Sequence, residues 1–245
     1  MPSVQDLITA LMLLTRLPVG WLGSGSSDLA RSVWAFPVVG LVVGLIGGLV
    51  YWPLHGLGVP AWLAASWAFV AILIVTGAFH EDGLADTVDG FGGGRTRERK
   101  LEIMRDSRIG SYGAAALGLS LLIRIGALAS LERPHLVLVA LVVTAMAGRA
   151  GMILPLMALP PARADGMAAG MAEIPRWSAS WALGLVLFLA GMTHMLVAAA
   201  TAAMASAAVI LFARRQIGGH TGDVLGATEV VVECATLTVL AAVLR

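Results

Sequence analysis

The chain has 245 residues, of which 58% are hydrophobic and only 13% charged, and its net charge is +1. Soluble domains carry roughly 25% charged residues, so the composition excludes an ordinary soluble enzyme and indicates a protein that folds in lipid. No polar block is long enough for a separate soluble domain, and we expect residues 1–245 to form a single integral-membrane domain. We expect no nucleic-acid partner and leave open whether the protein is a homo-oligomer.

The N-terminal segment contains an apolar stretch at 7–14. It is too short to cross a bilayer, which takes about 20 residues in a helix. We therefore predict a helix that lies at the membrane interface or packs on the helical bundle.

Seven later stretches are apolar enough to be membrane spans: 34–54, 61–80, 112–131, 135–156, 178–192, 194–213 and 224–244. The block 178–213 is too long for one span, so we divide it near 191–194, which leaves a short fifth span. The expected fold class is all-α: a polytopic membrane helical bundle with about seven transmembrane helices and an N-terminal interfacial helix.

The basic residues fall unevenly on the two sides of this bundle. Twelve of the sixteen lie on one side: Arg16, Arg31, Arg95, Arg97, Arg99, Lys100, Arg105, Arg108, Arg163, Arg176, Arg214 and Arg215. The positive-inside rule makes that side cytoplasmic. The polar segments 81–110 and 214–223 then share this side and can meet in one site.

The polar segment after the second predicted span carries Asp82, Asp86 and Asp89. Offsets of four and seven residues place the three carboxylates on one helical face. They repel one another unless a cation lies between them, and Mg²⁺ is the expected ion because it takes oxygen ligands together with substrate phosphates. We predict a metal and pyrophosphate site; the alternative is a solvated acidic helix end. His80 is a general base or ligand, or else an interfacial hydrogen-bonding residue.

A glycine run and a basic segment follow. The run 92–94 is expected to end the helix and to give a flexible or phosphate-cradling loop. Between 95 and 108, acids and bases alternate at helical spacing, which would stabilise a short helix. Arg105 and Arg108 are also candidate phosphate clamps, because a guanidinium group matches two phosphate oxygens at once.

A second candidate segment, Gly-Gly-His-Thr-Gly-Asp at 218–223, precedes the last span. The start of a helix offers free backbone N–H groups and the positive end of its dipole, so we predict phosphate binding at Gly219 and Thr221. Asp223 would complete the metal shell begun by the first motif. Gly222 and Gly226, one turn apart, would let a neighbouring helix approach closely.

Two carboxylates, Glu229 and Glu233, lie deeper in the last predicted span. Acidic groups are costly in lipid and are therefore functional by default. The alternative is that they form ion pairs with Arg124 or Arg149, which also fall inside predicted spans.

These motifs together resemble the cobalamin synthase family, whose members are adenosylcobinamide-GDP ribazoletransferases. The resemblance rests mainly on the segments 80–90, 101–110 and 218–233. It continues at Thr-Arg-Leu-Pro (15–18), at Phe-Pro-Val-Val-Gly (36–40) and at Gly-Arg (148–149), whereas 155–215 matches only in hydrophobic character.

The resemblance implies a multi-pass, Mg²⁺-dependent enzyme of the inner membrane, with its site facing the cytoplasm. It would join α-ribazole, or its 5′-phosphate, to adenosylcobinamide-GDP and release GMP. A ribose hydroxyl would attack the phosphate on the corrinoid's aminopropanol arm, and Mg²⁺ held by Asp82, Asp86 and Asp89 would neutralise the pyrophosphate. The candidates for accepting the hydroxyl proton are Asp223, Glu229 and His80.

Two other classes of protein also carry acidic residues in membrane helices. CDP-alcohol phosphotransferases and intramembrane prenyltransferases mount acidic motifs at the cytoplasmic face, but their aspartate spacings differ from the one seen in this chain. A cation transporter would distribute its acidic residues through the membrane depth, whereas most acids of these motifs cluster at one face.

Overall fold

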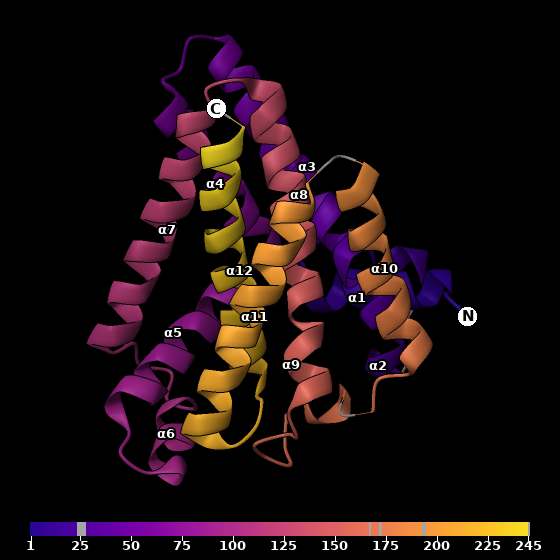
Figure 1. Cartoon of the computed structure of the whole chain (residues 1–245), viewed down its shortest axis with the longest axis vertical. Helices are drawn as coiled ribbons and strands as arrows, with labels where there is room; N and C mark the ends of the chain where they lie inside the picture. Colours follow the sequence, from indigo (N-terminus) through magenta and orange to yellow (C-terminus); the bar gives the residue numbers. More distant parts are fainter. Residues whose placement is uncertain (24–27, 167, 172, 193–194, 245) are drawn as a thin grey trace.

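The computed structural model describes residues 1–23, 28–166, 168–171, 173–192 and 195–244. Within these ranges the regular secondary structure is helical and there is no strand, which confirms the predicted all-α class. The helices are α1 Val4–Leu14, α2 Leu29–Ser32, α3 Phe36–Gly56, α4 Ala61–Thr76, α5 Phe79–Gly93, α6 Arg97–Ile103, α7 Ser111–Leu131, α8 Pro134–Gly151, α9 Ile153–Ala158, α10 Arg176–Met192, α11 Leu196–Ile217 and α12 Gly222–Val243 (Figure 1). Short 3-10 turns occur at Gly20–Leu22, Val33–Ala35 and Ala169–Met171.

Five described helical segments are long and apolar enough to cross a membrane: Leu29–Gly56, α7, Pro134–Ala158, α11 and α12. The bent pair of α4 and α5 makes six if it is counted as one span. The short fifth predicted span corresponds to α10, which has 17 residues. A multi-pass helical bundle is thus confirmed. Residues 193 and 194, at the predicted boundary between the fifth and sixth spans, lie outside the described residues.

The outer surface of the bundle is apolar. Leu49, Ile74, Leu122 and Met204, on four different helices, are 70–73% exposed. Apolar residues exposed singly are ordinary in soluble proteins, but these lie on α3, α7 and α11, which are long enough to span, and on α4, which reaches that length only together with α5. Lipid is therefore the solvent for these faces.

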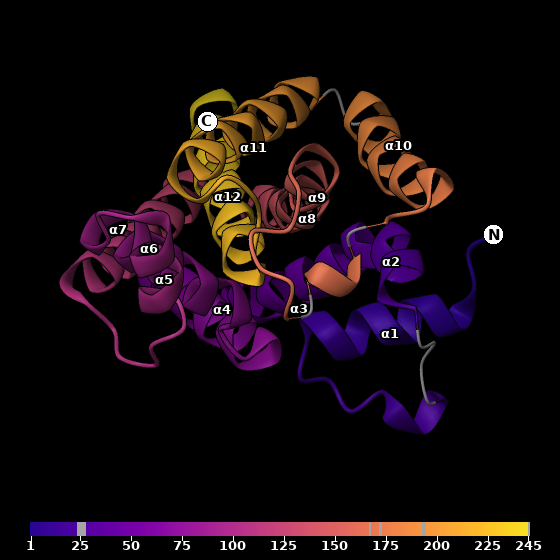
Figure 2. The ribbon, with the colours of Figure 1, turned by 90° about the horizontal axis from the view of Figure 1, so that it is seen from below.

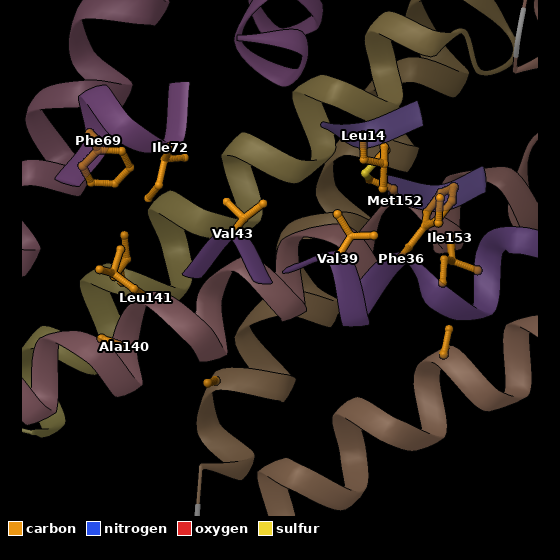
Figure 3. Close-up of a cluster of buried hydrophobic side chains, with 14 of the residues drawn as sticks. Leu14, Phe36, Val39, Val43, Phe69, Ile72, Ala140, Leu141, Met152 and Ile153 are labelled. Carbon is orange, nitrogen blue, oxygen red and sulfur yellow. The ribbon is translucent and has the colours of Figure 1, made fainter. Parts of the chain in front are cut away.

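The centre of the bundle forms where α3 packs on α8. Gly40, Gly44 and Gly48 recur every four residues along α3, and a β-carbon on Gly40 would lie 2.4 Å from the backbone oxygen of Ala145. Such small residues let two membrane helices approach until their backbones touch. Around this contact lie buried side chains from α1, α3, α4, α8 and α9, among them Leu14, Phe36, Val43, Phe69, Leu141 and Ile153 (Figure 3).

The second predicted span does not run straight to residue 80. Helix α4 ends at Thr76, and α5 starts at Phe79 with its axis turned by 89°. Gly77 and Ala78 both adopt left-handed backbone conformations, with φ of +66° and +53°. Glycine accepts this conformation freely, whereas alanine does so at a cost of about 1–2 kcal/mol. His80 therefore belongs to α5 and not to the end of the preceding span.

The bend turns the acidic helix across one end of the bundle. Helix α6, the chain that follows α9 and the turn between α11 and α12 lie at this same end, opposite the α3–α4 and α7–α8 connections (Figures 1 and 2). The prediction that 81–110 and 214–223 share one end of the bundle is confirmed. At the other extreme of the sequence, the predicted N-terminal helix is α1, which packs on the bundle through buried Ile8, Ala10 and Leu14.

Candidate functional site

The two acidic motifs meet where α5 crosses α12. A β-carbon on Gly83 would lie 2.8 Å from the backbone oxygen of Asp223 and 3.2 Å from the Cα of Gly226. Of the predicted glycine pair, Gly226 makes this contact, whereas a β-carbon on Gly222 would meet nothing within 4 Å. The absence of side chains at the crossing brings Asp223 beside the acidic face of α5.

Four aspartates and one arginine make up the charged centre of this crossing. Asp86 experiences repulsion from Asp82, Asp223 and Asp89 and attraction to Arg163. Asp82 is exposed, Asp86 is half-buried, and the side chain of Asp223 is 20% exposed. The three aspartates Asp82, Asp86 and Asp223 therefore form an acidic patch open to solvent at the end of the bundle, which we call the aspartate patch.

Arg163 is the residue of this site that we did not predict from the sequence. Its Nη2 donates a hydrogen bond to Asp223 Oδ2 at 2.9 Å, and its side chain is 19% exposed. In the sequence it was one of twelve basic residues on the side of the bundle that we predicted to be cytoplasmic. It lies in the loop after α9, far from both acidic motifs along the chain, so no local pattern connects it with them.

A parallel backbone bridge holds the loop that carries Arg163. The N–H of His220 donates to the oxygen of Pro160 at 2.9 Å, and the N–H of Ala162 donates to the oxygen of His220 at 2.8 Å. Gly219 allows this pairing, since a β-carbon there would lie 2.4 Å from the Pro160 oxygen. The glycine-rich segment before α12 thus positions the arginine as well as Asp223.

Asp89 has a different environment from the other three aspartates. Its carboxylate is buried and accepts hydrogen bonds from the N–H groups of Gly110 at 2.7 Å and Gly113 at 2.9 Å. These groups belong to the first turn of α7, whose N-cap is Gly110. Asp89 therefore has a structural role, since it caps α7 from another helix. Its role as a metal ligand stays a prediction.

Thr221 and Gly219, the predicted phosphate-binding residues of the second motif, are both buried. The Thr221 hydroxyl accepts the N–H of Val224 as the N-cap of α12 and donates to Asp223 Oδ2 at 3.1 Å. Gly219 packs on Pro160. The structure shows these roles in helix capping and loop pairing, and phosphate binding by the two residues stays a prediction.

Arg105 and Arg108, the predicted phosphate clamps, lie on the surface and point to acidic partners. Arg105 Nη2 contacts both carboxylate oxygens of Asp165 at 2.6 Å, and its side chain is 54% exposed. Arg108 binds Asp106, and these hydrogen bonds lower the pKa of Asp106 to about 2. A phosphate would have to displace a charged carboxylate at either position, so clamping by these residues stays a prediction.

Beneath the aspartate patch lies a buried ionic network. Arg124 on α7 donates from Nη1 to Glu81 at 3.0 Å and to Glu233 at 2.9 Å. All three side chains are at most 9% exposed. We could assign no role to Glu81 from the sequence, and the structure shows that it ties α5 to α7 and α12.

The second half of the network contains Arg149, Glu229 and His80. Arg149 Nη1 lies 2.8 Å from Glu229 Oε1, and His80 Nδ1 lies 3.8 Å from the same oxygen. The ion pairing that we considered for the intramembrane glutamates is thus present. Glu229 lies six residues after Asp223 in α12, which places it about 9 Å deeper along the helix axis. Proton transfer by His80 or Glu229 stays a prediction, from positions only 1–2% exposed.

The carboxylate oxygens of the aspartate patch are donors of the kind that Mg²⁺ prefers. Within the described ranges, no group of three or more acidic, histidine or cysteine side chains is already close enough to enclose a metal by itself. Mg²⁺ does not need such a cage, because it usually binds one or two carboxylates and completes its shell with water and substrate phosphates. Three carboxylates face a single arginine here, which leaves the surplus negative charge that a cation would neutralise.

The family model described as cobalamin-5-phosphate synthase matches residues 6–241 of the chain. Similar proteins named adenosylcobinamide-GDP ribazoletransferase occur in several bacteria. The one from Bradyrhizobium diazoefficiens is 48% identical over 98% of this chain and 94% of its own length. Those from Mesorhizobium japonicum and Sinorhizobium medicae are 44% and 43% identical, over 96% and 97% of this chain and 92% and 96% of their own lengths. No solved structure matches the chain.

Proposed function

The chain belongs to the cobalamin-5-phosphate synthase family, and we propose that it joins adenosylcobinamide-GDP to α-ribazole or α-ribazole 5′-phosphate. The products would be adenosylcobalamin, or its 5′-phosphate, and GMP. The observation that carries this proposal from the structure is the crossing of α5 and α12, which gathers Asp82, Asp86 and Asp223 at one end of a membrane bundle.

The proposed reaction is a displacement at phosphorus. A ribose hydroxyl forms a new bond to the phosphate on the corrinoid's aminopropanol arm, the bond from that phosphate to GMP breaks, and the hydroxyl loses its proton. Asp82, Asp86 and Asp223 would hold Mg²⁺ with the pyrophosphate oxygens, and the bound ion would neutralise the charge that develops on the departing GMP. The aspartates therefore supply position and charge balance.

Asp223 is the best placed of the three candidate proton acceptors. His80 and Glu229 are almost fully buried in the ionic network, and a substrate hydroxyl would have to enter the bundle to reach them. The side chain of Asp223 is 20% exposed and is itself part of the aspartate patch. We therefore assign the hydroxyl proton to Asp223, with His80 and Glu229 in supporting positions beneath it.

The depth of the acidic residues argues against a cation transporter. Glu229 and Glu233 do lie inside the bundle, but Arg124 and Arg149 pair with them. An ion pathway would need carboxylates that are free to exchange partners with a passing cation. The remaining acids of the two motifs lie at one end of the bundle, as a surface enzyme requires.

We place the site at the cytoplasmic face of the inner membrane. The end of the bundle that carries the aspartate patch also carries α6 and the end of α11, with Arg97, Arg99, Lys100, Arg214 and Arg215. An excess of basic residues marks the cytoplasmic side of a membrane protein. A water-soluble nucleotide substrate and the released GMP would enter and leave from that side.

The direct test measures GMP released by the purified protein in detergent with adenosylcobinamide-GDP, α-ribazole and Mg²⁺. Turnover is expected with Mg²⁺ and not with EDTA, and Asp82→Asn and Asp86→Asn should each lower it by orders of magnitude. Glu98→Gln, which removes an exposed acid on α6, is the control and should remain within about twofold of the wild type. Full activity in both aspartate variants would rule out their metal role.

A further inference from the structure

We propose that Arg163, which holds Asp223 through one end of its guanidinium group, also binds the pyrophosphate of the GDP-activated substrate. This inference rests on the proposed function. The two ends of the guanidinium group differ in their contacts. Nη2 donates to Asp223, whereas Nη1 is buried and has no hydrogen-bond partner in the described part of the chain. A buried guanidinium N–H without an acceptor is costly, so Arg163 has donor capacity left for a phosphate oxygen.

The backbone near Arg163 is fixed on two sides. Hydrogen bonds between 160–162 and His220 pair this loop with the segment before α12. From the other direction, Arg97 on α6 donates from Nη2 to the oxygen of Ala162 at 2.5 Å and from Nε to the oxygen of Ile217 at 2.8 Å. Because the loop is anchored, the arginine is held at the patch before substrate binds, which lowers the entropic cost of binding.

The charge of the patch explains why an arginine is needed there. Asp82, Asp86 and Asp223 attract a metal ion but repel a pyrophosphate. Arg163 bonds Asp223 directly, and its positive charge also acts on Asp86 across the crossing. A guanidinium group can hold a carboxylate on one edge and phosphate oxygens on another, because it carries five donors in a fixed plane.

The surface arginines offer a useful contrast. Arg105 and Arg108 are more exposed than Arg163, and each is turned toward a carboxylate outside the patch. The charge of Arg163, in contrast, acts on Asp86 of α5 and on Asp223 of α12. The structure therefore assigns the direct phosphate contact to Arg163.

A purely structural role would give different kinetics. If Arg163 only neutralised Asp223, its loss would change the Mg²⁺ requirement and the stability but leave affinity for the nucleotide substrate unchanged. If it binds pyrophosphate, its loss raises KM for adenosylcobinamide-GDP and weakens binding of GMP and inorganic pyrophosphate. KM for α-ribazole, which carries no pyrophosphate, should change little in either case.

The experiment compares Arg163→Met and Arg163→Lys with Arg31→Met. Arg31 on α2 is a matched control because it also lies near an aspartate, Asp6 on α1, and Figure 2 shows α1 and α2 on the opposite side of the bundle from α5 and α6. Each purified protein is assayed for GMP release, and binding of GMP and of pyrophosphate in the presence of Mg²⁺ is followed by the shift in thermal unfolding midpoint. Loss of one charged hydrogen bond predicts roughly a 10- to 100-fold fall in kcat/KM for adenosylcobinamide-GDP in Arg163→Met. Arg163→Lys keeps the charge, so its kcat/KM should lie between those of Arg163→Met and the wild type.

The outcomes separate the inference from the proposed function. If the wild type releases no GMP, the proposed function fails, whereas weaker pyrophosphate binding in Arg163→Met would still support an anion site. If the wild type is active and Arg163→Met and Arg163→Lys keep its KM and its midpoint shift with GMP, Arg163 does not bind the substrate and the inference is overturned. Should Arg163→Met fail to fold, the KM for adenosylcobinamide-GDP and the midpoint shift with GMP are compared between Arg163→Lys and the wild type, and unchanged values overturn the inference.

Discussion

Asp89 and Gly113 lie on different helices and share a hydrogen bond, in which the Gly113 N–H donates to Asp89 Oδ1 at 2.9 Å. The other oxygen of the same carboxylate accepts the Gly110 N–H. A β-carbon on Gly113 would lie 2.3 Å from Asp89 Oδ2, so glycine is required for this approach. Two aspartates on one face of α5 thus have separate tasks: Asp89 caps α7, and Asp86 belongs to the aspartate patch.

This division predicts that a change from aspartate to asparagine lowers stability at position 89 but lowers activity at position 86. Asp89→Asn replaces a charged acceptor by a neutral amide and should lower the free energy of unfolding by about 1–3 kcal/mol. Asp86→Asn removes a repelled charge and should leave stability unchanged or slightly higher, while abolishing Mg²⁺-dependent turnover. Thermal unfolding in detergent and the GMP assay measure the two effects. Equal loss of stability in both variants would contradict the division.

The crossing of α5 and α12 predicts that the smallest side chain is already too large at Gly83. In Gly83→Ala the new β-carbon would lie 2.8 Å from the backbone oxygen of Asp223, and the helices must separate. Overpacking of this kind costs about 1–3 kcal/mol, and a shift of the aspartates should lower kcat/KM at least about tenfold. Gly126→Ala on α7 is the control, because a β-carbon there meets nothing within 4 Å. Gly126→Ala should keep full activity. Normal activity in Gly83→Ala would show that the close approach of α5 and α12 is not needed for turnover.

Much of the fold could be predicted from the sequence because lipid imposes a simple rule on it. A helix must be apolar over about 20 residues to cross the membrane, so hydropathy located α3, α7, α8, α11 and α12. The acidic face of α5 followed from residue spacing alone. The 89° bend could not be predicted, since the sequence around Gly77 and Ala78 remains apolar and the bend depends on how α5 packs against α12.

The site was predictable only where its residues lie in one motif. Asp82, Asp86 and Asp223 were identified by the unusual grouping of carboxylates next to apolar segments. Arg163 was not, because its place in the site depends on backbone pairing between two distant loops. Asp89 looked equivalent to its neighbours, and only the approach of α7 gives it a different partner.

The buried network predicts a large cost for removing one of its arginines. Arg124→Met leaves Glu81 and Glu233 without their shared partner, and the loss of one member of a buried ion pair typically costs about 3–5 kcal/mol. Arg99→Met breaks an exposed pair with Glu102 and should change stability by no more than about 1 kcal/mol. Chemical unfolding in detergent compares the two. Adding Glu233→Gln to Arg124→Met removes one unpaired buried charge and should recover part of the lost free energy of unfolding. If the double variant is no more stable than Arg124→Met, the unpaired charge is not the cause of the loss.

His220 predicts how stability depends on acid. Its ring is buried in the turn between α11 and α12, and neither ring nitrogen has a hydrogen-bond partner among the residues that the structure describes. Burial lowers its pKa in the folded protein, whereas in the unfolded chain a histidine titrates near about 6.5. Above that pH the ring is neutral in both states. As the pH falls below it, the unfolded chain binds a proton that the folded protein does not, so folding becomes less favourable.

The stability contributed by the neutral ring should therefore be complete at pH 8 and decline below about pH 6.5, by at most about 1.4 kcal/mol per pH unit. His220→Asn removes this dependence, so its unfolding midpoint should fall less between pH 8 and pH 5.5 than that of the wild type. His135→Asn, at an exposed histidine near the start of α8, controls for the loss of a histidine as such. Because the other titrating groups are common to all three proteins, an identical fall in wild type and His220→Asn would mean that the ring of His220 gains its proton in the folded state as well.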